Sequence, residues 1–172
     1  MSVATEQDKK YDELQKIGAN AMSCIADMVA ALECDYDRLE ELRGERSDYK
    51  SEEHAETWEV AFPDESTELA ELEAAAGGCT SREDAEQRIQ EDPLSLEVRS
   101  GWTSPGEPLE AEEFCLLLST GGPATRIVGE IRNGQAYRPR LEAQDWFTPW
   151  TEYADSDRDI LESYCNVVCC FQ

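Results

Sequence analysis

Three patterns in the sequence predict an α+β fold, in which an N-terminal helical region precedes a small antiparallel sheet packed by a C-terminal helix. Apolar residues recur at helical spacing from Tyr11 to Leu42. Between residues 94 and 141, apolar and polar residues alternate as they do in strands. Helical spacing returns from Asp157 to Phe171. A chain of 172 residues suffices for one domain with a helical appendage.

The first element is predicted to be one long amphipathic helix, or a helical hairpin arm, over residues 11–43. Its apolar residues alternate steps of three and four, as in a heptad seam. A helix of this length runs about 48 Å, which is more than a domain this small can cover. We therefore expect either a homodimer through residues 11–42 or a fold-back on the next helix, because Gly44 and Ser47 can interrupt the first one.

Two shorter helices are predicted in the rest of the acidic helical region, residues 1–92, preceded by either a connector or a third short helix. In chain order these three segments cover about 52–60, 66–76 and 81–91. Gly77 and Gly78 end the second of them. The third begins at Ser81, with Asp84 three residues later in the pattern of a capping box.

Residues 93–172 are predicted to form about four antiparallel strands and the C-terminal helix. Leu94, Leu96 and Val98 alternate with polar residues, which predicts a half-buried strand. The run from 114 to 118 is apolar at every position. That strand is therefore expected to be central and covered on both faces.

A β-hairpin is predicted around Asn133-Gly134. A two-residue loop would set Ile127 opposite Arg140, so we expect a three-residue loop with Gly134 left-handed in a bulge. That register places four apolar residues on one face: Ile127, Ile131, Tyr137 and Leu141. Pro139 cannot donate a ladder hydrogen bond, so its strand is expected at a sheet edge.

Charge is the strongest functional signal in this chain. It has 39 acidic and 15 basic residues, for a formal net charge of −24. Residues 33–92 alone carry 21 acidic and 6 basic residues. Such a segment indicates a solvating role or a cationic partner. Its field repels phosphates and anionic lipid, which argues against direct binding to nucleic acid or membrane.

Residues suited to catalysis or metal binding are sparse. His54 is the only histidine and lies among glutamates, which is typical of an exposed side chain. Cys165, Cys169 and Cys170 lack the paired Cys-x-x-Cys or second histidine of a zinc site. We expect no enzyme activity, no metal and no cofactor. Seven cysteines without a signal-like N-terminus indicate reduced thiols and a cytoplasmic location.

Four blocks of the sequence carry a family resemblance: ALECDYDRLEEL from Ala31, EVRSGW from Glu97, Glu113-Phe with TGGPA from Thr120, and QDWFTPWT from Gln144. With these blocks the chain resembles a family of small uncharacterised proteins encoded by bacteriophages and prophages. The similarity covers most of residues 30–165, whereas the C-terminus departs from the Phe-Tyr-Phe-Gly ending of similar proteins. The resemblance implies an accessory protein that acts in the cytoplasm of an infected bacterium, and no specific activity.

Charge and resemblance together predict a non-enzymatic counter-defence protein, of anti-CRISPR or anti-restriction type. It would bind the cationic nucleic-acid-binding surface of a host protein or defence complex by DNA mimicry. The residues expected to contact this partner are Asp35, Asp37, Glu40, Glu41, Glu45, Asp48, Glu52, Glu53, Glu56, Trp102 and Trp150. Trp146 is expected to pack in the core instead.

Two alternatives remain open at this point. The first is an oligomeric coiled-coil adaptor that binds a protein partner without mimicry. The second is a small-molecule binder or enzyme that uses the loops of residues 101–123. In either case the acidic residues would only keep the helical arm solvated.

Overall fold

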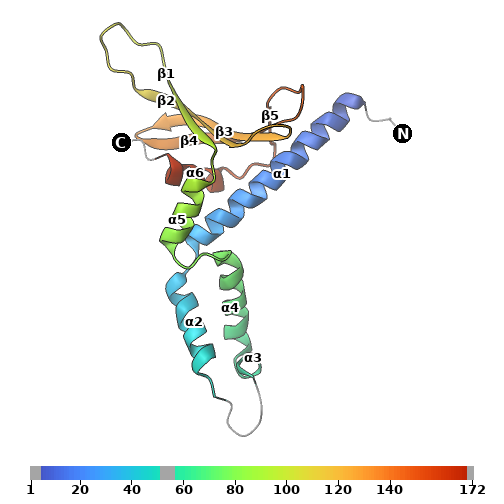
Figure 1. Ribbon diagram of the computed structural model, residues 1–172, viewed down its shortest axis with the longest axis vertical. Helices are drawn as coiled ribbons and strands as arrows, with labels where there is room; N and C mark the ends of the chain where they lie inside the picture. The colour runs from blue at the N-terminus through green and yellow to red at the C-terminus, as the bar shows by residue number, and fades with distance from the viewer. Residues whose placement is uncertain (1–4, 51–56, 170–172) are drawn as a thin grey trace. The chain divides into compact units, whose positions relative to one another are not determined.

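The computed structural model describes residues 5–50 and 57–169, which form two compact units. The sheet unit comprises Met1–Ala26 and Arg88–Gln172, and the helical unit comprises Asp27–Gln87. Figure 1 follows the elements along the chain. N-terminal helices, a five-stranded antiparallel sheet and a C-terminal helix confirm the predicted α+β class.

The prediction of one helix over 11–43 is wrong, because the structure has two helices there, α1 (Glu6–Glu33) and α2 (Tyr36–Asp48). Asp35 separates them, since its carboxylate accepts a hydrogen bond from the Arg38 backbone N–H (3.0 Å) and caps α2. The Tyr36 hydroxyl donates to the Ala31 carbonyl of α1 (2.9 Å). Because the apolar spacing continues across this break, the sequence pattern did not indicate the cap.

No single described helix is long and apolar enough to span a membrane, although the bent pair α1 and α2 together reaches that length and composition.

The helical unit is built on a hairpin, in which α2 packs against α4 (Pro63–Ala76) with the short helix α3 (Trp58–Ala61) between them (Figure 1). Its core consists of Leu39, Leu42, Trp58, Leu69 and Ala76. The hairpin matches the predicted alternative of a helix that folds back on the next one. The interruption expected at Gly44 and Ser47 is wrong, because α2 continues to Asp48. The homodimer stays a prediction.

The two later helices of this region follow their local capping signals. α4 starts at Pro63, three residues before the predicted start, because proline is well tolerated at the first helical position. Gly77 ends it with a left-handed φ of 57°. α5 (Arg82–Glu91) begins as predicted, since Asp84 accepts from the Thr80 N–H (2.9 Å) and donates its own N–H to the Ser81 hydroxyl (3.2 Å). The connector helix expected over 52–60 lies partly outside the described residues.

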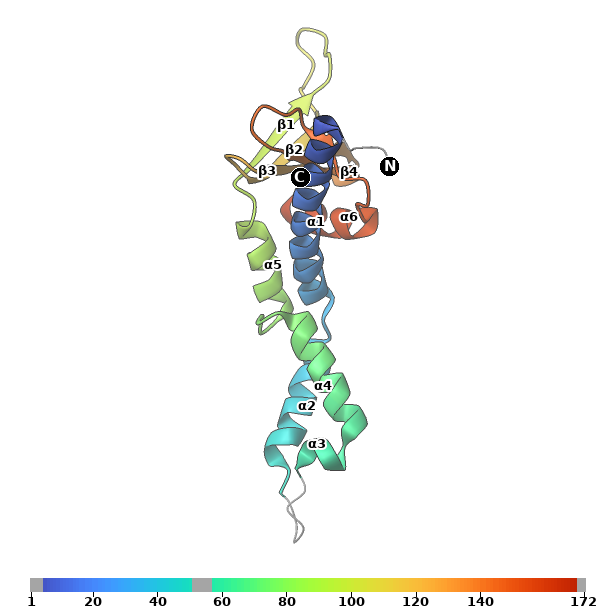
Figure 2. The ribbon, with the colours of Figure 1, turned by 90° about the vertical axis from the view of Figure 1, so that its right-hand side faces the viewer.

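The sheet is an antiparallel meander whose strands follow the order of the sequence. They are β1 (Ser95–Ser100), β2 (Ala111–Ser119), β3 (Ala124–Arg132), β4 (Gln135–Gln144) and β5 (Thr151–Glu152). The short β5 adds a fifth strand to the four predicted. The C-terminal helix α6 (Arg158–Val168) packs on β4 and buries Leu161, Tyr164 and Cys165, as predicted (Figures 1 and 2).

The start of α1 belongs to the sheet unit through contacts near β5. The Gln15 side chain donates to the Glu152 carbonyl (3.0 Å) and accepts from the Ala154 N–H (3.0 Å). Gly18 lies directly against the Tyr153 side chain. The predicted division after residue 92 separates the N-terminal helices from the strands and α6, and it differs from the division into compact units.

The hairpin between β3 and β4 has a two-residue loop, Asn133-Gly134, and the predicted three-residue loop is wrong. Both loop residues have positive φ, 53° and 75°, as a type I′ turn requires. Ile127 and Leu141 lie on one face as predicted, and they pair directly because a bulge lies further along β4 at Arg138 and the residue after it, opposite Gly129.

Two further expectations about this hairpin need correction. Tyr137 lies on the opposite face from Ile127, because it precedes the bulge and pairs with Glu130. β4 is not the outermost strand, since β5 pairs with it at Glu142 and Ala143. Pro139 nevertheless lies outside that short ladder, so its missing N–H interrupts no pairing with β5.

β1 and β2 are less covered than predicted. Leu94, Leu96 and Val98 are exposed by 59%, 40% and 53%, so the expected half-buried strand is wrong. β1 is an edge strand and pairs only with β2 among the described strands. In β2, Phe114 is buried while Cys115 on the other face is only half-buried. The expectation of cover on both faces is wrong, because charged residues of the neighbouring strands share that second face.

Candidate functional site

Five of the nine acidic residues predicted to contact a partner form a single face of α2. We call Asp37, Glu40, Glu41, Glu45 and Asp48 the acidic face. At about 100° per residue they fall within a sector of about 140° and extend over about 17 Å of helix. The buried Leu39 and Leu42 point the opposite way, into the hairpin core. All five acidic side chains are therefore exposed.

The three arginines of α2 all form ion pairs within the helical unit. Arg38 donates two hydrogen bonds to Glu68 (3.0 and 2.7 Å) and one to Glu41 (2.8 Å). The other ion pairs are Arg43–Glu73 (3.1 Å) and Arg46–Glu59 (2.7 Å). The hydrogen bonds from Arg38 lower the pKa of Glu68, so this pair stays ionised at neutral pH.

These pairs leave most of the acidic face uncompensated. Asp37, Glu40, Glu45 and Asp48 make no ion pair with any residue that the structure describes. The facing helix α4, which lies alongside α2 in both views, adds carboxylates of the same kind: Asp64, Glu65 and Glu71 (Figures 1 and 2). The hairpin is thus an ordered surface with a large excess of negative charge. Asp35 belongs to its edge, where the side chain is engaged as the cap of α2.

The remaining predicted contact residues are not gathered at this surface. Glu52, Glu53 and Glu56 lie outside the described residues, as does His54. Both tryptophans belong to the sheet unit, at opposite ends of the sheet. Trp102 is fully exposed in the loop between β1 and β2.

The other tryptophans follow β4. Trp150 is half-buried beneath the Arg126 guanidinium, whose carbon lies 4.2 Å from the ring centroid. The prediction that Trp146 packs in the core is wrong, because 65% of it is exposed. Its indole covers the backbone of Gly122, and neighbouring Phe147 is also exposed with a left-handed φ of 63°.

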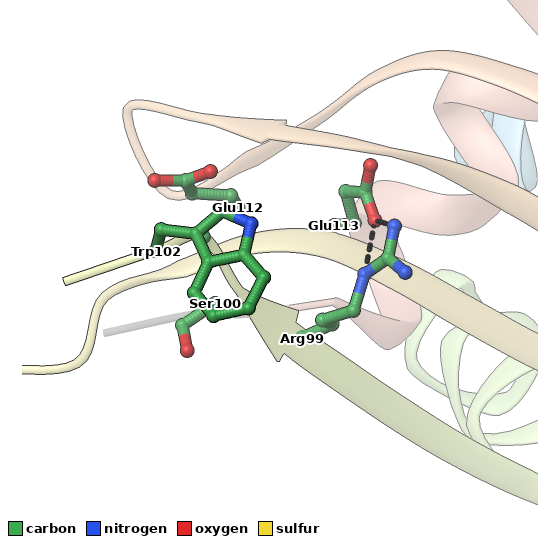
Figure 3. Close-up of a pocket in the computed structure, with 6 residues that line it drawn as sticks. Arg99, Ser100, Trp102, Glu112 and Glu113 are labelled. Atoms are coloured by element: carbon green, nitrogen blue, oxygen red, sulfur yellow. Dashed lines mark hydrogen bonds and ion pairs between the residues drawn. The ribbon is translucent and has the colours of Figure 1, made fainter.

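The loop between β1 and β2 borders an open pocket of about 470 Å³, which is the place to look for the predicted small-molecule site (Figure 3). Figure 3 shows the Trp102 indole beside the Glu112 side chain, and Arg99 hydrogen-bonded to Glu113. Because Arg99 already occupies Glu113, this pocket presents one carboxylate and one exposed ring. It contains no pairing of a nucleophile with a base.

Three of the described cysteines are poor candidates for an activated thiolate. Burial raises the pKa of the Cys34, Cys115 and Cys165 thiols, so these three stay protonated at neutral pH. Within residues 5–50 and 57–169, no cluster of three or more His, Cys, Asp or Glu side chains is arranged to hold a metal ion.

Sequence reasoning missed a second charged surface, on the face of the sheet opposite its apolar core. It carries ion pairs between and along the strands: Arg99–Glu113, Arg126–Glu142 (2.7 Å) and Arg132–Glu130 (2.8 Å). The signal was present, since arginine and glutamate recur at alternate positions of β3 and β4. The ion pairs make this surface close to neutral, in contrast to the acidic face.

Comparison of the chain with protein-family models, curated proteins and solved structures finds no match.

Proposed function

We propose that this chain is a non-enzymatic protein that binds a cationic, nucleic-acid-binding surface of another protein through its acidic face. The main support is that four carboxylates without an ion pair lie on one side of α2, while the other side of this helix is buried in the hairpin core. An ordered array loses little conformational freedom on binding, which favours affinity.

The spacing of the acidic face supports mimicry of a nucleic-acid strand. The four carboxylates without an ion pair extend over about 17 Å, which corresponds to one uncompensated negative charge per about 4–6 Å of helix. One strand of B-DNA presents a phosphate every 3.4 Å along its axis. A protein groove that is built for phosphates would therefore meet a linear density of charge that is somewhat lower but of the same order.

Biological context narrows the class of partner. The resemblance to bacteriophage and prophage proteins supports a counter-defence role of anti-CRISPR or anti-restriction type in the host cytoplasm. The partner would then be a host nucleic-acid-binding protein or defence complex. Attraction between opposite charges would also speed the encounter by about 10- to 1000-fold at low salt.

A capture experiment from bacterial lysate tests this function. The acidic-face variant replaces four residues by their amides, Asp37→Asn, Glu40→Gln, Glu45→Gln and Asp48→Asn. The control variant changes the net charge equally in the sheet unit, with Glu97→Gln, Glu107→Gln, Glu110→Gln and Asp155→Asn. Proteins captured at about 0.1 M and about 0.5 M salt are identified by mass spectrometry.

We expect nucleic-acid-binding proteins to be captured by the natural chain and the control variant at low salt only. The acidic-face variant should lose them while keeping its helical circular dichroism. Equal capture by both variants would mean that net charge, and not the acidic face, attracts the partner. Capture that survives high salt would favour the adaptor function instead.

A further inference from the structure

A groove in the sheet unit gathers most of its arginines in one place. It encloses about 800 Å³ beside β4 and is lined by Arg99, Arg138, Arg140 and Arg158. Phe114 and Gly129 contribute an apolar part of its wall. Arg138 and Arg140 come from β4, whereas Arg158 is the first residue of α6. These arginines come from elements that are far apart in the sequence, so the sequence pattern did not indicate that they line one groove.

Three of these arginines form no ion pair within the described residues, although the Arg138 guanidinium carbon lies 5.1 Å from the Tyr137 ring centroid. Arg138, Arg140 and Arg158 have no carboxylate within 4.0 Å among the described residues. Other arginines of both units do form ion pairs, namely Arg38, Arg43, Arg46, Arg82, Arg99, Arg126 and Arg132. In a chain with 39 acidic residues, unpaired guanidinium groups on one groove are unexpected.

The carboxylates that border the groove do not cancel this charge. Glu113 is occupied by Arg99, and Glu130 by Arg132. Only Glu152 is left to face the three unpaired arginines. The groove is thus locally cationic on a molecule that is strongly anionic overall.

The backbone at the groove is also unusual. The β4 bulge sets Arg138 and Pro139 opposite Gly129, and Arg138 has a left-handed φ of 50°. Bulges redirect side chains from the regular alternation of a strand and are common beside binding sites. Gly129 leaves no room for a side chain, since a Cβ there would lie 2.7 Å from the Phe114 ring. Glycine at 129 therefore allows the Phe114 ring and the β4 bulge to pack closely against β3.

We propose that this groove binds a small phosphate-bearing molecule through Arg138, Arg140 and Arg158. A guanidinium group is always charged and presents a planar fork to phosphate oxygens. Several guanidinium groups suit a ligand of at least two negative charges better than they suit a single carboxylate.

The overall charge of the chain limits the size of this ligand. A net charge of −24 repels a long polyanion such as nucleic acid at many points at once. A small ligand feels chiefly the nearby arginines, because salt screens charges beyond about 8 Å. The shared chemistry is a phosphate or phosphoanhydride group, carried by a nucleotide or by an inorganic phosphate.

Isothermal titration calorimetry on the full chain tests the proposal with three probes: ATP, inorganic pyrophosphate and citrate. We expect heat from at least one phosphate probe and at least tenfold weaker binding in Arg140→Gln/Arg158→Gln, since each lost charge-assisted hydrogen bond weakens affinity about tenfold or more. Arg82→Gln in the helical unit removes the same charge away from the groove and should bind normally. Unchanged circular dichroism shows that the variants fold.

Each outcome of the titration either supports or overturns the proposed phosphate-binding groove. Binding of ATP alone assigns a nucleotide, and equal binding of pyrophosphate assigns the phosphate group as the recognised part. Citrate binding as tightly as either phosphate would overturn the proposal, as would the absence of heat up to about 5 mM ligand. Equal affinity in the double variant would overturn it too. None of these outcomes depends on the acidic face, whose capture experiment stands separately.

Discussion

Two helical glycines should respond to the same substitution in opposite directions. Replacing glycine by alanine in a helix interior stabilises it by about 0.5–1 kcal/mol, because alanine loses less backbone entropy on folding. A Cβ built on Gly44 in α2 meets no heavy atom within 4 Å. We therefore expect Gly44→Ala to keep the whole gain.

Gly18 in α1 lacks that space. A Cβ there would lie 2.7 Å from both Cβ and Cγ of Tyr153 and 2.9 Å from Cδ2. These atoms are at the base of the ring, so the ring cannot swing away without moving its backbone. Overpacking of this kind costs about 1–3 kcal/mol. Because the gain from alanine is common to both sites, Gly18→Ala should be less favourable than Gly44→Ala by about 1–3 kcal/mol.

Urea denaturation monitored by circular dichroism and tryptophan fluorescence measures this difference. Gly44 lies in the helical unit and Gly18 in the sheet unit, so each variant is compared with the transition of its own unit. A matched test places Gly18→Ala in a Tyr153→Gly background, which removes Cβ, Cγ and Cδ2 together, so the substitution should no longer destabilise. If Gly18→Ala stabilises the natural chain as much as Gly44→Ala does, the close packing inferred at Tyr153 is wrong.

Three further predictions concern pH, a helix cap and a turn. Burial raises the pKa of Tyr36 to about 12 from about 10, so the stability of the helical unit should fall as pH rises between these values. Tyr36→Phe should abolish that fall in thermal unfolding measured against pH. Asp157→Ala should destabilise the sheet unit by about 0.5–2 kcal/mol in urea, because its carboxylate accepts from the N–H groups of Asp159 (3.0 Å) and Ile160 (3.2 Å). Gly134→Ala should cost about 1–2 kcal/mol in the same assay, since φ is 75° there, and no loss would refute the type I′ turn.

Elements whose ends carry a local signal were predictable from the sequence. The stop at Gly77, the start of α5 at Ser81 and Asp84, and the start of α6 at Asp157 all depend on residues within one helical turn. The excess of negative charge near α2 is likewise a property of composition. These features need no knowledge of distant contacts.

The long seam shows where local patterns fail. Apolar spacing alone continues through Asp35, and only the packing of α2 on α4 makes the break favourable by giving both faces a shared core. Hairpin register was also undecided by alternation, because a bulge at the turn and a bulge at Arg138 both leave Ile127 and Leu141 on one face, and only the second pairs them directly. Burial and register depend on what lies across from a residue, and that partner is remote in the sequence.

The two charged surfaces also combine features that are visible in the sequence with features that only the tertiary structure determines. From the sequence alone come the number of acidic residues on α2 and their helical spacing. Tertiary structure decided which of them are compensated, since Arg38 finds Glu68 only once the hairpin closes. It also decided that Arg158 joins Arg138 and Arg140 on one groove. Charge is a property of each side chain, whereas its compensation is a property of neighbours that folding brings together.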